Sequence, residues 1–350
     1  AVGMGGTTAN SGSMAVGNNV KAGENSGGAF AVGMGGTSAD GSSMAVGDNV
    51  HATGSAFASG RNGTSAQSGG IAYGDNVSAQ YGGFAAGTNS TSASSGVAVG
   101  SNVHASDGSS YAGGMNNTTA ANGSIAFGNN VQAGSSSSGG AFAAGMNGTT
   151  ADGSSVAVGD NVHASSGSYA AGMGGTSASS SAVAIGNNAH AYGNSYVFGF
   201  SASADSSSAA IGNSSYATNS SLALGNSAGA YVSGGIALGS NSTVYRGATP
   251  GLDPRNGQPS ENTTPTWKST YGALSIGAVD SSGNVTGTRQ IIGVAAGTND
   301  TDAVNMAQLK QVAQGFSIHD YGVNSIDTTT DTNYNLSLIH ISEPTRRYAI

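Results

Sequence analysis

The chain has 350 residues and a formal net charge of −8, and 60 of its residues are glycine, whereas only 7% are charged and cysteine is absent. Alanine and valine supply most of the 37% hydrophobic residues, so the chain cannot build the thick leucine- and phenylalanine-based core of an ordinary enzyme of this length. Lys21 and Arg61 are the only basic residues among the first 242, which excludes electrostatic binding of a nucleic-acid backbone there. We therefore expect no nucleic-acid partner.

The beginning of the chain carries no export signal. Residues 1–6 lack the charged and apolar regions of a signal peptide, and no run of about 18 apolar residues occurs. The sequence opens in the middle of a repeating pattern. We therefore expect a fragment whose export signal and membrane anchor lie outside it, so that any membrane contact is made only through that absent anchor.

A motif of small or apolar residues that ends in glycine recurs through residues 1–242, as in Ser13-Met14-Ala15-Val16-Gly17. The repeat glycines are Gly3, Gly17, Gly33, Gly47, Gly60, Gly74, Gly87, Gly100, Gly114, Gly128, Gly145, Gly159, Gly172, Gly186, Gly199, Gly212, Gly225 and Gly239. They follow one another at roughly 14 residues, which is too short for a helical hairpin of roughly 30 residues. The spacing predicts an all-β chain in which each unit is one coil of a β-solenoid, with a β-roll head over residues 1–242.

Each coil divides into two short strands. In the first type, as in Met14-Ala15-Val16, three successive residues are small or apolar, which indicates that both faces of the strand are covered. In the second type, as in Val50-His51-Ala52, apolar and polar residues alternate, so one face is in water. The interior of a 14-residue coil covers only one face of the first strand. We therefore predict that its other face packs against another subunit.

The turns between the strands supply residues that tolerate a positive φ, as in Gly17-Asn18-Asn19 and its relatives at Gly47-Asp48-Asn49 and Gly128-Asn129-Asn130. Alternate coils carry a different corner, as in the stretch from Gly33 to Ala39. The true period is therefore expected to be a pair of coils, or roughly 28 residues.

The composition changes after residue 242. No proline precedes Pro250, and residues 243–288 contain four of the five prolines together with Trp267. Proline would remove a hydrogen bond from a continuous strand ladder. We predict a proline-containing insertion and final head segment at 243–288, in which Trp267 anchors its own loop.

Residues 289–315 break the 14-residue rule. Asp300 or Thr301 is predicted to cap a helix that runs to about Gln314. Met306, Leu309, Ala313 and Phe316 follow at 3-4-3 spacing, which suits a short helix leading into a stalk or another packed module.

The repeats, followed by Arg289-Gln290-Ile291, Val294–Thr298 and Asp302–Lys310, resemble the head and neck of YadA-like trimeric autotransporter adhesins over residues 1–315. The resemblance implies a homotrimer of left-handed parallel β-rolls, a neck that leads into a coiled-coil stalk, and display on a Gram-negative outer membrane. Two features depart from the family: the repeats alternate in type, and Met306 stands where the family more often has valine.

Beyond the neck, residues 316–335 are interpreted as a lead-in to a stalk or a further head. Residues 336–350, with the run Ser342-Glu343-Pro344-Thr345-Arg346-Arg347, match neither the repeat nor the neck. We expect them to be a non-native tail, similar to a translated sequencing adapter.

The residues that could carry chemistry follow the repeat. Serine is so common that a set of serine, histidine and aspartate is expected by chance, so we predict no catalytic residues and no enzyme activity. His51, His104, His163 and His190 each lie four residues after a repeat glycine and should share one solvated column, whose charge could change with pH because histidine titrates near neutrality. Equivalent positions of paired coils would lie roughly 10 Å apart, beyond the reach of a shared zinc ion. We expect no metal and no cofactor.

Adhesion is the predicted function, because a long repetitive surface offers many weak equivalent contacts that three chains multiply. The resemblance implies extracellular-matrix proteins such as collagen, or the host cell surface, as partners; self-association stays open. In related heads the Ser-Val-Ala-Ile-Gly motif is associated with collagen binding. The ligand-binding residues implied here are Ser124, Ile125, Ala126, Gly128, Ser155, Val156, Ala157, Gly159, Val183, Ala184, Ile185, Gly186, Ser221, Leu222, Ala223 and Gly225.

Two other classes of protein compete with the adhesin. A phage tail fibre could use similar repeats. An ice-binding solenoid could present a column of threonines, namely Thr7, Thr37, Thr64, Thr91, Thr118, Thr149 and Thr176. Those threonines align with Val20 and Val50 of the neighbouring coils, which are predicted to point inward, and this weakens the ice-binding hypothesis.

Overall fold

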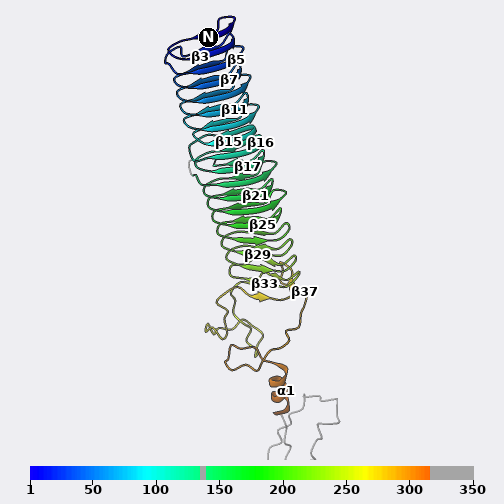
Figure 1. Cartoon of the computed structure of the whole chain (residues 1–350). Coiled ribbons are helices and arrows are strands. Elements are labelled where there is room, and N and C mark those ends of the chain that lie inside the picture. The colour runs from blue at the N-terminus through cyan, green and yellow to red at the C-terminus, as the bar shows by residue number, and fades with distance from the viewer. Residues whose placement is uncertain (135–138, 316–350) are drawn as a thin grey trace, which may run out of the picture. The chain divides into compact units, whose positions relative to one another are not determined.

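The computed structural model describes residues 1–134 and 139–315. The chain divides into two compact units, Ala1–Gln290 and Ile291–Ile350, and each is described by itself. In the first unit short parallel strands stack coil upon coil (Figure 1). Each coil contributes a first strand and a second strand, which lie on two different faces of the solenoid.

The strands belong to two series. The first strands are β1 (Val2–Met4), β3 (Met14–Asn18), β5 (Phe30–Met34), β7 (Met44–Asp48), β9 (Phe57–Arg61), β11 (Ile71–Asp75), β13 (Phe84–Thr88), β17 (Ile125–Asn129), β19 (Phe142–Met146), β21 (Val156–Asp160), β23 (Tyr169–Met173), β25 (Val183–Asn187), β27 (Tyr196–Phe198), β29 (Ala209–Ile211), β31 (Leu222–Leu224), β33 (Ile236–Leu238) and β35 (Leu274–Ser275). The second strands are β2 (Thr8–Ala9), β4 (Lys21–Ala22), β6 (Ser38–Asp40), β8 (His51–Thr53), β10 (Ser65–Gln67), β12 (Ser78–Gln80), β14 (Ser92–Ser94), β18 (Gln132–Ala133), β20 (Thr150–Ala151), β22 (His163–Ser165), β24 (Ser177–Ser179), β26 (His190–Tyr192), β28 (Ser203–Ala204), β30 (Tyr216–Ala217), β32 (Gly229–Ala230) and β34 (Thr243–Val244). Two longer strands, β15 (Val97–Ala105) and β16 (Tyr111–Ala120), continue round the corner and belong to both series.

The register of the strands follows the repeat glycines. Gly3 pairs with Gly17, and Gly17 in turn pairs with Gly33. The same parallel pairing places the repeat glycine of each coil beside that of the next as far as Gly186. The predicted all-β parallel solenoid with coils of about 14 residues is therefore confirmed.

The core of the solenoid is thin and is built from small side chains. Most first strands have a fully buried central alanine, such as Ala126, and most second strands have a buried alanine, such as Ala52. Valine and threonine alternate in the third inward column, which consists of Val20, Thr37, Val50, Thr64, Val77, Thr91, Val103, Thr118, Val131, Thr149, Val162 and Thr176. This alternation is the predicted pairing of coils.

The threonines of this column satisfy backbone carbonyls inside the coil. Thr64 Oγ1 lies 2.9 Å from the carbonyl oxygens of both Arg61 and Gly74, and Thr149 makes the equivalent contacts. A buried hydroxyl needs such partners, and it cannot contact an ice surface. The ice-binding hypothesis is therefore wrong for these threonines.

The corners adopt the backbone conformations that the sequence predicts. Asn19, Asn49 and Asn130 have φ values of 55°, 54° and 56°. Asparagine tolerates this left-handed region better than most residues do. The chain can therefore turn sharply without a glycine at each corner.

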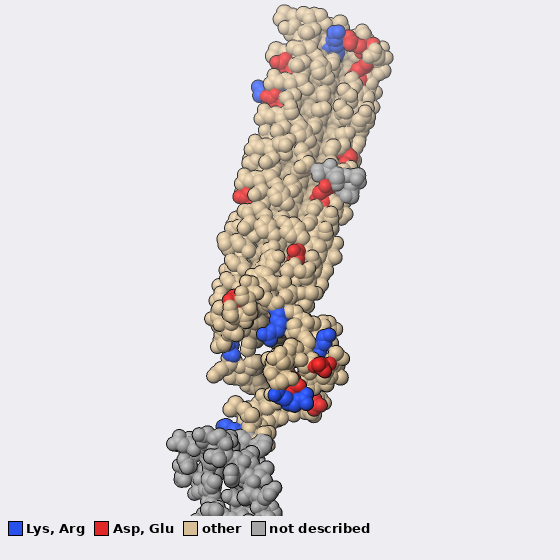
Figure 2. All heavy atoms as spheres, turned by 180° about the vertical axis from the view of Figure 1, so that it is seen from behind, with Lys and Arg blue, Asp and Glu red and all other residues tan. Residues whose placement is uncertain are grey.

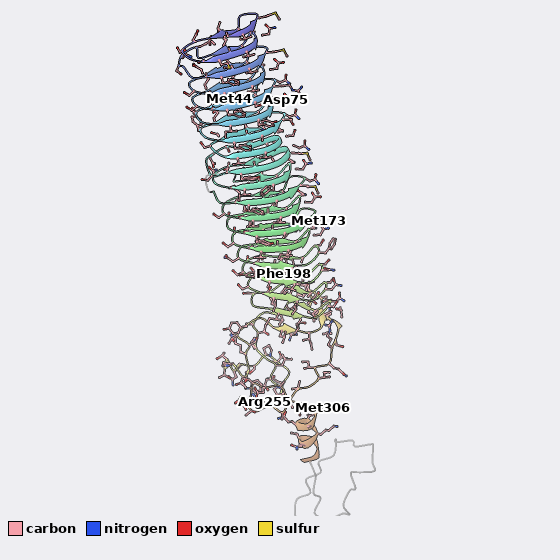
Figure 3. The ribbon with its side chains drawn as sticks, in the orientation of Figure 1. Met44, Asp75, Met173, Phe198, Arg255 and Met306 are labelled. Carbon is pink, nitrogen blue, oxygen red and sulfur yellow. The ribbon has the colours of Figure 1, made fainter. Side chains whose placement is uncertain are left out.

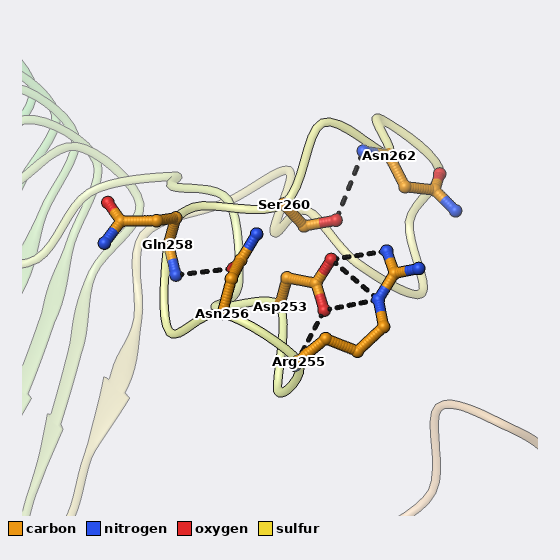
Figure 4. A network of polar contacts seen from close by, with 6 residues as sticks. All are labelled: Asp253, Arg255, Asn256, Gln258, Ser260 and Asn262. Carbon is orange, nitrogen blue, oxygen red and sulfur yellow. Dashed lines mark hydrogen bonds and ion pairs between the residues drawn. The ribbon is translucent and has the colours of Figure 1, made fainter.

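The chain leaves the stack after β34 and returns at β35, which pairs in parallel with β33. In the intervening loop the Asp253 carboxylate contacts the Arg255 guanidinium at 2.6 Å, and neighbouring backbone amides bond to Asn256 and Ser260 (Figure 4). A two-stranded antiparallel sheet, β36 (Ala278–Val279) with β37 (Val285–Gly287), follows.

Arg289 caps the last coil. Its guanidinium donates to Ser242 Oγ at 2.7 Å and also to the carbonyl oxygens of Ser240 and Ile276. A terminal coil exposes carbonyls that a further coil would otherwise bond. Arg289 therefore supplies donors where the strand ladder ends.

The second unit contains one helix among its described residues, α1 (Met306–Gly315). The predicted cap at Asp300 or Thr301 is wrong. Asn305 Oδ1 accepts from the backbone amides of Ala307 and Gln308, and Gln308 Oε1 accepts from the Asn305 amide, which is a reciprocal capping box. Asp302 instead accepts from the amides of a preceding turn.

The interpretations of residues 316–335 as a lead-in and of 336–350 as a non-native tail fall outside the described residues.

Candidate binding surface

The predicted ligand-binding residues lie on the first strands β17, β21, β25 and β31 and at their borders. Alternation along a strand sends their side chains to opposite faces. The outward members are Ile125, Val156, Val183, Ile185 and Leu222, which are partly or substantially exposed.

The remaining predicted residues face into the coil or form its glycine ladder. The alanines Ala126, Ala157, Ala184 and Ala223 are fully buried, and Ser124, Ser155 and Ser221 are at most 4% exposed. Gly128, Gly159, Gly186 and Gly225 belong to the ladder. None of these residues offers an exposed side chain that a ligand could contact on the folded coil.

The buried serines hold adjacent coils together. Ser124 Oγ accepts from the backbone amide of Ala141 at 3.1 Å, and Ser155 Oγ accepts from that of Ser168 at 3.1 Å. Both bonds cross from one coil to the next. A serine at this place in the motif therefore satisfies the backbone rather than a ligand.

The sequence-based set omitted the outward third residue of several first strands. Phe127, Val158 and Leu224 are each about as exposed as Ile185, at 38–41%. The Phe127 ring lies 4.9 Å from that of Tyr111 in the preceding coil. The period-two alternation that marks Ile185 as outward would have identified these residues as well.

The first and third residues of the first strands together form what we call the outer apolar face. In its first column Met14, Phe30, Met44, Phe57, Ile71 and Phe84 succeed one another in register. Val16, Val32 and Val46 begin the second column. Single exposed apolar residues are normal on a soluble protein, but a continuous apolar surface is typical of a site of association.

A third outward column lies next to the repeat glycine, at the edge of the same face. Met34, Met115, Met146 and Met173 occupy it and are more than half exposed. Asp75 takes the equivalent place in another coil, and Figure 3 shows Asp75 and Met173 projecting from the same edge of the solenoid.

The second strands present a polar face. His51, His104, His163 and His190 share one column of this face, as predicted. His163 Nδ1 lies 2.8 Å from Thr150 Oγ1 of the preceding coil, and its Nε2 lies 3.1 Å from Asn161 Oδ1. The other three histidines repeat this pattern with a serine and an asparagine, so each ring bridges two coils.

Neither metal binding nor strong charge marks this surface. Within the described residues no group of three or more histidine, aspartate or glutamate side chains could hold a metal ion. Burial lowers the pKa of His104 below its usual value. Figure 2 shows only scattered charged side chains over the solenoid face that it displays.

Comparisons with known proteins find similarity to one group of bacterial adhesins. Residues 290–334 match the family described as the coiled stalk of trimeric autotransporter adhesin. A segment of 82 residues, 23% of this chain, is 49% identical to autotransporter adhesin BadA of Bartonella henselae. The chain is related to the trimeric autotransporter adhesins. The resemblance seen in the sequence is thereby confirmed.

A second adhesin gives the same result. Autotransporter adhesin EhaG of Escherichia coli O157:H7 is 36% identical over 92 residues, which are 26% of this chain. The matched segments cover only 2% of BadA and 5% of EhaG. Both relatives are named as adhesins.

Among solved structures, the collagen-binding domain of the Yersinia adhesin YadA matches 62% of this chain and 82% of its own length, at 22% identity and a TM-score of 0.27. Because this TM-score is low, we assign the fold of the present chain from its own strand pairing and not from that superposition. Among residues 1–134 and 139–315, no helix is long and apolar enough to cross a membrane.

Proposed function

We propose that this chain supplies the head and neck of a trimeric adhesin on the surface of a Gram-negative bacterium, where it attaches the cell to host extracellular matrix, to host cells or to other copies of itself. The observation that carries the proposal is the outer apolar face, which a single chain leaves exposed along its solenoid. The matches to a stalk family and to two named adhesins support the same function.

The outer apolar face fits a second and a third copy of the chain. Each column repeats with the spacing of stacked strands, so copies in parallel and in register would bring equal residues together in every coil. Burial of these side chains would stabilise the assembly by about 25 cal/mol per Å² of apolar surface removed from water. The family described for residues 290–334 is itself trimeric.

This arrangement changes the role of the predicted binding residues. Ile125, Val156, Val183, Ile185 and Leu222 lie on the outer apolar face. In the proposed trimer they contact another copy, so their substitution would weaken ligand binding through loss of assembly. Direct contact with a ligand would then belong to the polar second-strand face and to the corners.

Adhesion is tested with the whole chain immobilised at equal density on beads. The beads are offered collagen, fibronectin, laminin, cultured epithelial cells, and the same chain in solution. We expect saturable binding to at least one of these partners, and none by beads that carry the thermally unfolded chain. Folded chain that binds no matrix protein, no cell and no copy of itself would refute the proposed function.

A further inference from the structure

A shallow trough of about 450 Å³ lies on the second-strand face. It extends over five successive second strands, from Gln132 of β18 to Tyr192 of β26, and Asp152, His163 and Ser179 are among the residues that line it. This volume falls within the range of roughly 300–1,000 Å³ that is typical of small-ligand sites. The trough is distinct from the outer apolar face, because it lies on the other series of strands.

The trough exists because small side chains follow one another in the column that ends in Tyr192. Ser165 pairs with Ser179, and Ser179 pairs with Tyr192. Because their side chains are short, Ser165 and Ser179 leave open space above the strands at the bottom of the trough. The Tyr192 hydroxyl lies 3.1 Å from Ser177 Oγ, and its ring is parallel to that of His190 at a centroid distance of 6.5 Å. These contacts hold an aromatic ring at one end of the trough.

An internal duplication shows that the trough is not a necessary product of the fold. The sequence from Ala29 to Ala52 closely matches that from Ala141 to Ala164, an offset of 112 residues that continues in register along the following coils. At this offset Asp152 and His163 correspond to Asp40 and His51. The two residues that shape the trough differ: Ser179 corresponds to Gln67 and Tyr192 to Gln80. A glutamine thus occupies the place where Ser179 leaves the floor open.

The groups in the trough are those that recognise hydroxyls. The Ser165 and Ser179 hydroxyls and the Gln132 amide have no side-chain hydrogen-bond partner in the part of the chain that the structure describes. Hydroxyl and amide groups can donate and accept at once. The tyrosine adds an apolar ring with a polar tip, against which the C–H face of a sugar ring can pack.

We propose that the trough binds a neutral oligosaccharide. Lys21 in β4 and Arg61 in β9 are the only lysine or arginine residues before residue 246, and neither lines the trough, which contains Asp152. A sulfated or sialylated sugar would therefore meet a carboxylate and no lysine or arginine among the residues that line the trough. A neutral sugar meets the Ser165 and Ser179 hydroxyls and the Gln132 amide, which can accept or donate hydrogen bonds to it.

The geometry argues against the other polymers that a surface groove could hold. A peptide cannot add as a strand, since β22 already pairs with β20 on one side and β24 on the other. Nucleic acid would require a basic groove. The remaining class is a neutral, hydroxyl-rich chain.

The inference deepens the proposed adhesive function and rests on it only for the origin of the sugar, which would be a glycan of the host surface. A trough on each of three chains would multiply a weak single-site affinity. The two claims are tested apart, because sugar binding is measured in solution and adhesion on beads.

The experiment titrates the whole chain with chitotriose, maltotriose, mannotriose and lactose, observed by saturation-transfer NMR, with sialyllactose and a heparin tetrasaccharide alongside. We expect at least one neutral sugar to bind and both acidic sugars to fail. Two variants, Ser179→Gln and Tyr192→Gln, each introduce the residue that the duplicated segment already carries at that place. Each is expected to weaken binding roughly tenfold while leaving the circular dichroism spectrum unchanged.

The matched control is Tyr231→Ala, because Tyr231 lies outside the trough and is 39% exposed, close to the 43% of Tyr192. It should bind the sugar as the unaltered chain does. Binding by none of the neutral sugars would overturn the proposal, as would binding that survives both glutamine variants. If beads adhere to cells but the chain binds no neutral sugar, the sugar site is refuted and the adhesive function stands. If the chain binds a neutral sugar but the beads adhere to nothing, only the adhesive function is refuted.

Discussion

The repeat glycines are required because adjacent coils approach one another too closely for any side chain. A Cβ atom on Gly74, whose φ is +141°, would lie 1.8 Å from the carbonyl oxygen of Gly87. The same clash recurs from Gly3 onward at 1.6–1.9 Å in many coils. The glycine ladder therefore records backbone contact between coils, in addition to the corner conformations that its periodicity predicts.

Substitution Gly74→Ala should therefore destabilise the solenoid strongly. Both the clash and the φ angle oppose a methyl group, and we expect the free energy of unfolding to fall by about 3 kcal/mol or more. Urea unfolding followed by far-UV circular dichroism measures this change. Gly247→Ala is the control, because no atom lies within 4 Å of the added Cβ there. Equal stability of the two variants would contradict this account of the ladder.

At the same scale, sequence reasoning located the inward and outward side chains well. The constant spacing from the repeat glycine identified the histidine column, and alignment with Val20 and Val50 identified the inward threonines, because each coil repeats the same geometry. Such reasoning could not reveal the trough. The trough forms where Ser179 is small, whereas the equivalent residue Gln67 is larger. The size of this one side chain matters only when the coils are stacked.

Among the elements, the helix shows why the spacing of capping residues matters. Asp300, Thr301 and Asn305 are all residue types that cap helices. The choice falls on Asn305 because Gln308, three positions later, completes the capping box and also bonds to Gly297. Asp302 is engaged with the turn before it. The spacing of Asn305 and Gln308 could have separated the alternatives from sequence, because Asp300 and Thr301 have no glutamate or glutamine three positions later.

Substitution Asn305→Ala should shorten α1. It removes the acceptor of the Ala307 and Gln308 amides, and we expect a loss of about 1 kcal/mol in local helix stability. Hydrogen exchange of those two amides, measured by NMR, should accelerate several-fold. Asp300→Ala should leave both rates unchanged, and the opposite ranking of the two variants would restore the cap that the sequence alone suggests.

For the whole molecule, a thin core of alanine, valine and threonine buries little apolar surface per coil, while larger apolar side chains remain outside it. This distribution is unfavourable for an isolated chain and favourable for an assembly that covers the outer apolar face. The sequence indicated this face through strands that are apolar on both sides. The number of copies came from family resemblance and not from any residue.

A single charge on the outer apolar face should dissociate the assembly. Ile185→Asp places a carboxylate in each of three equivalent positions, where it would be both desolvated and repelled by its copies. We expect the assembly to fall apart or to form only at much higher protein concentration, as seen by sedimentation velocity. Gln67→Asp, on the polar face, is the control and should assemble normally. A fully assembled Ile185→Asp variant would show that this face is not the interface.

The mass of the unaltered chain in solution tests the central claim most directly. Multi-angle light scattering, combined with a circular dichroism spectrum to confirm β structure, should give three times the mass of one chain over a wide concentration range. A β-rich monomer would contradict the account, because it would show that the outer apolar face is stable in water without a partner.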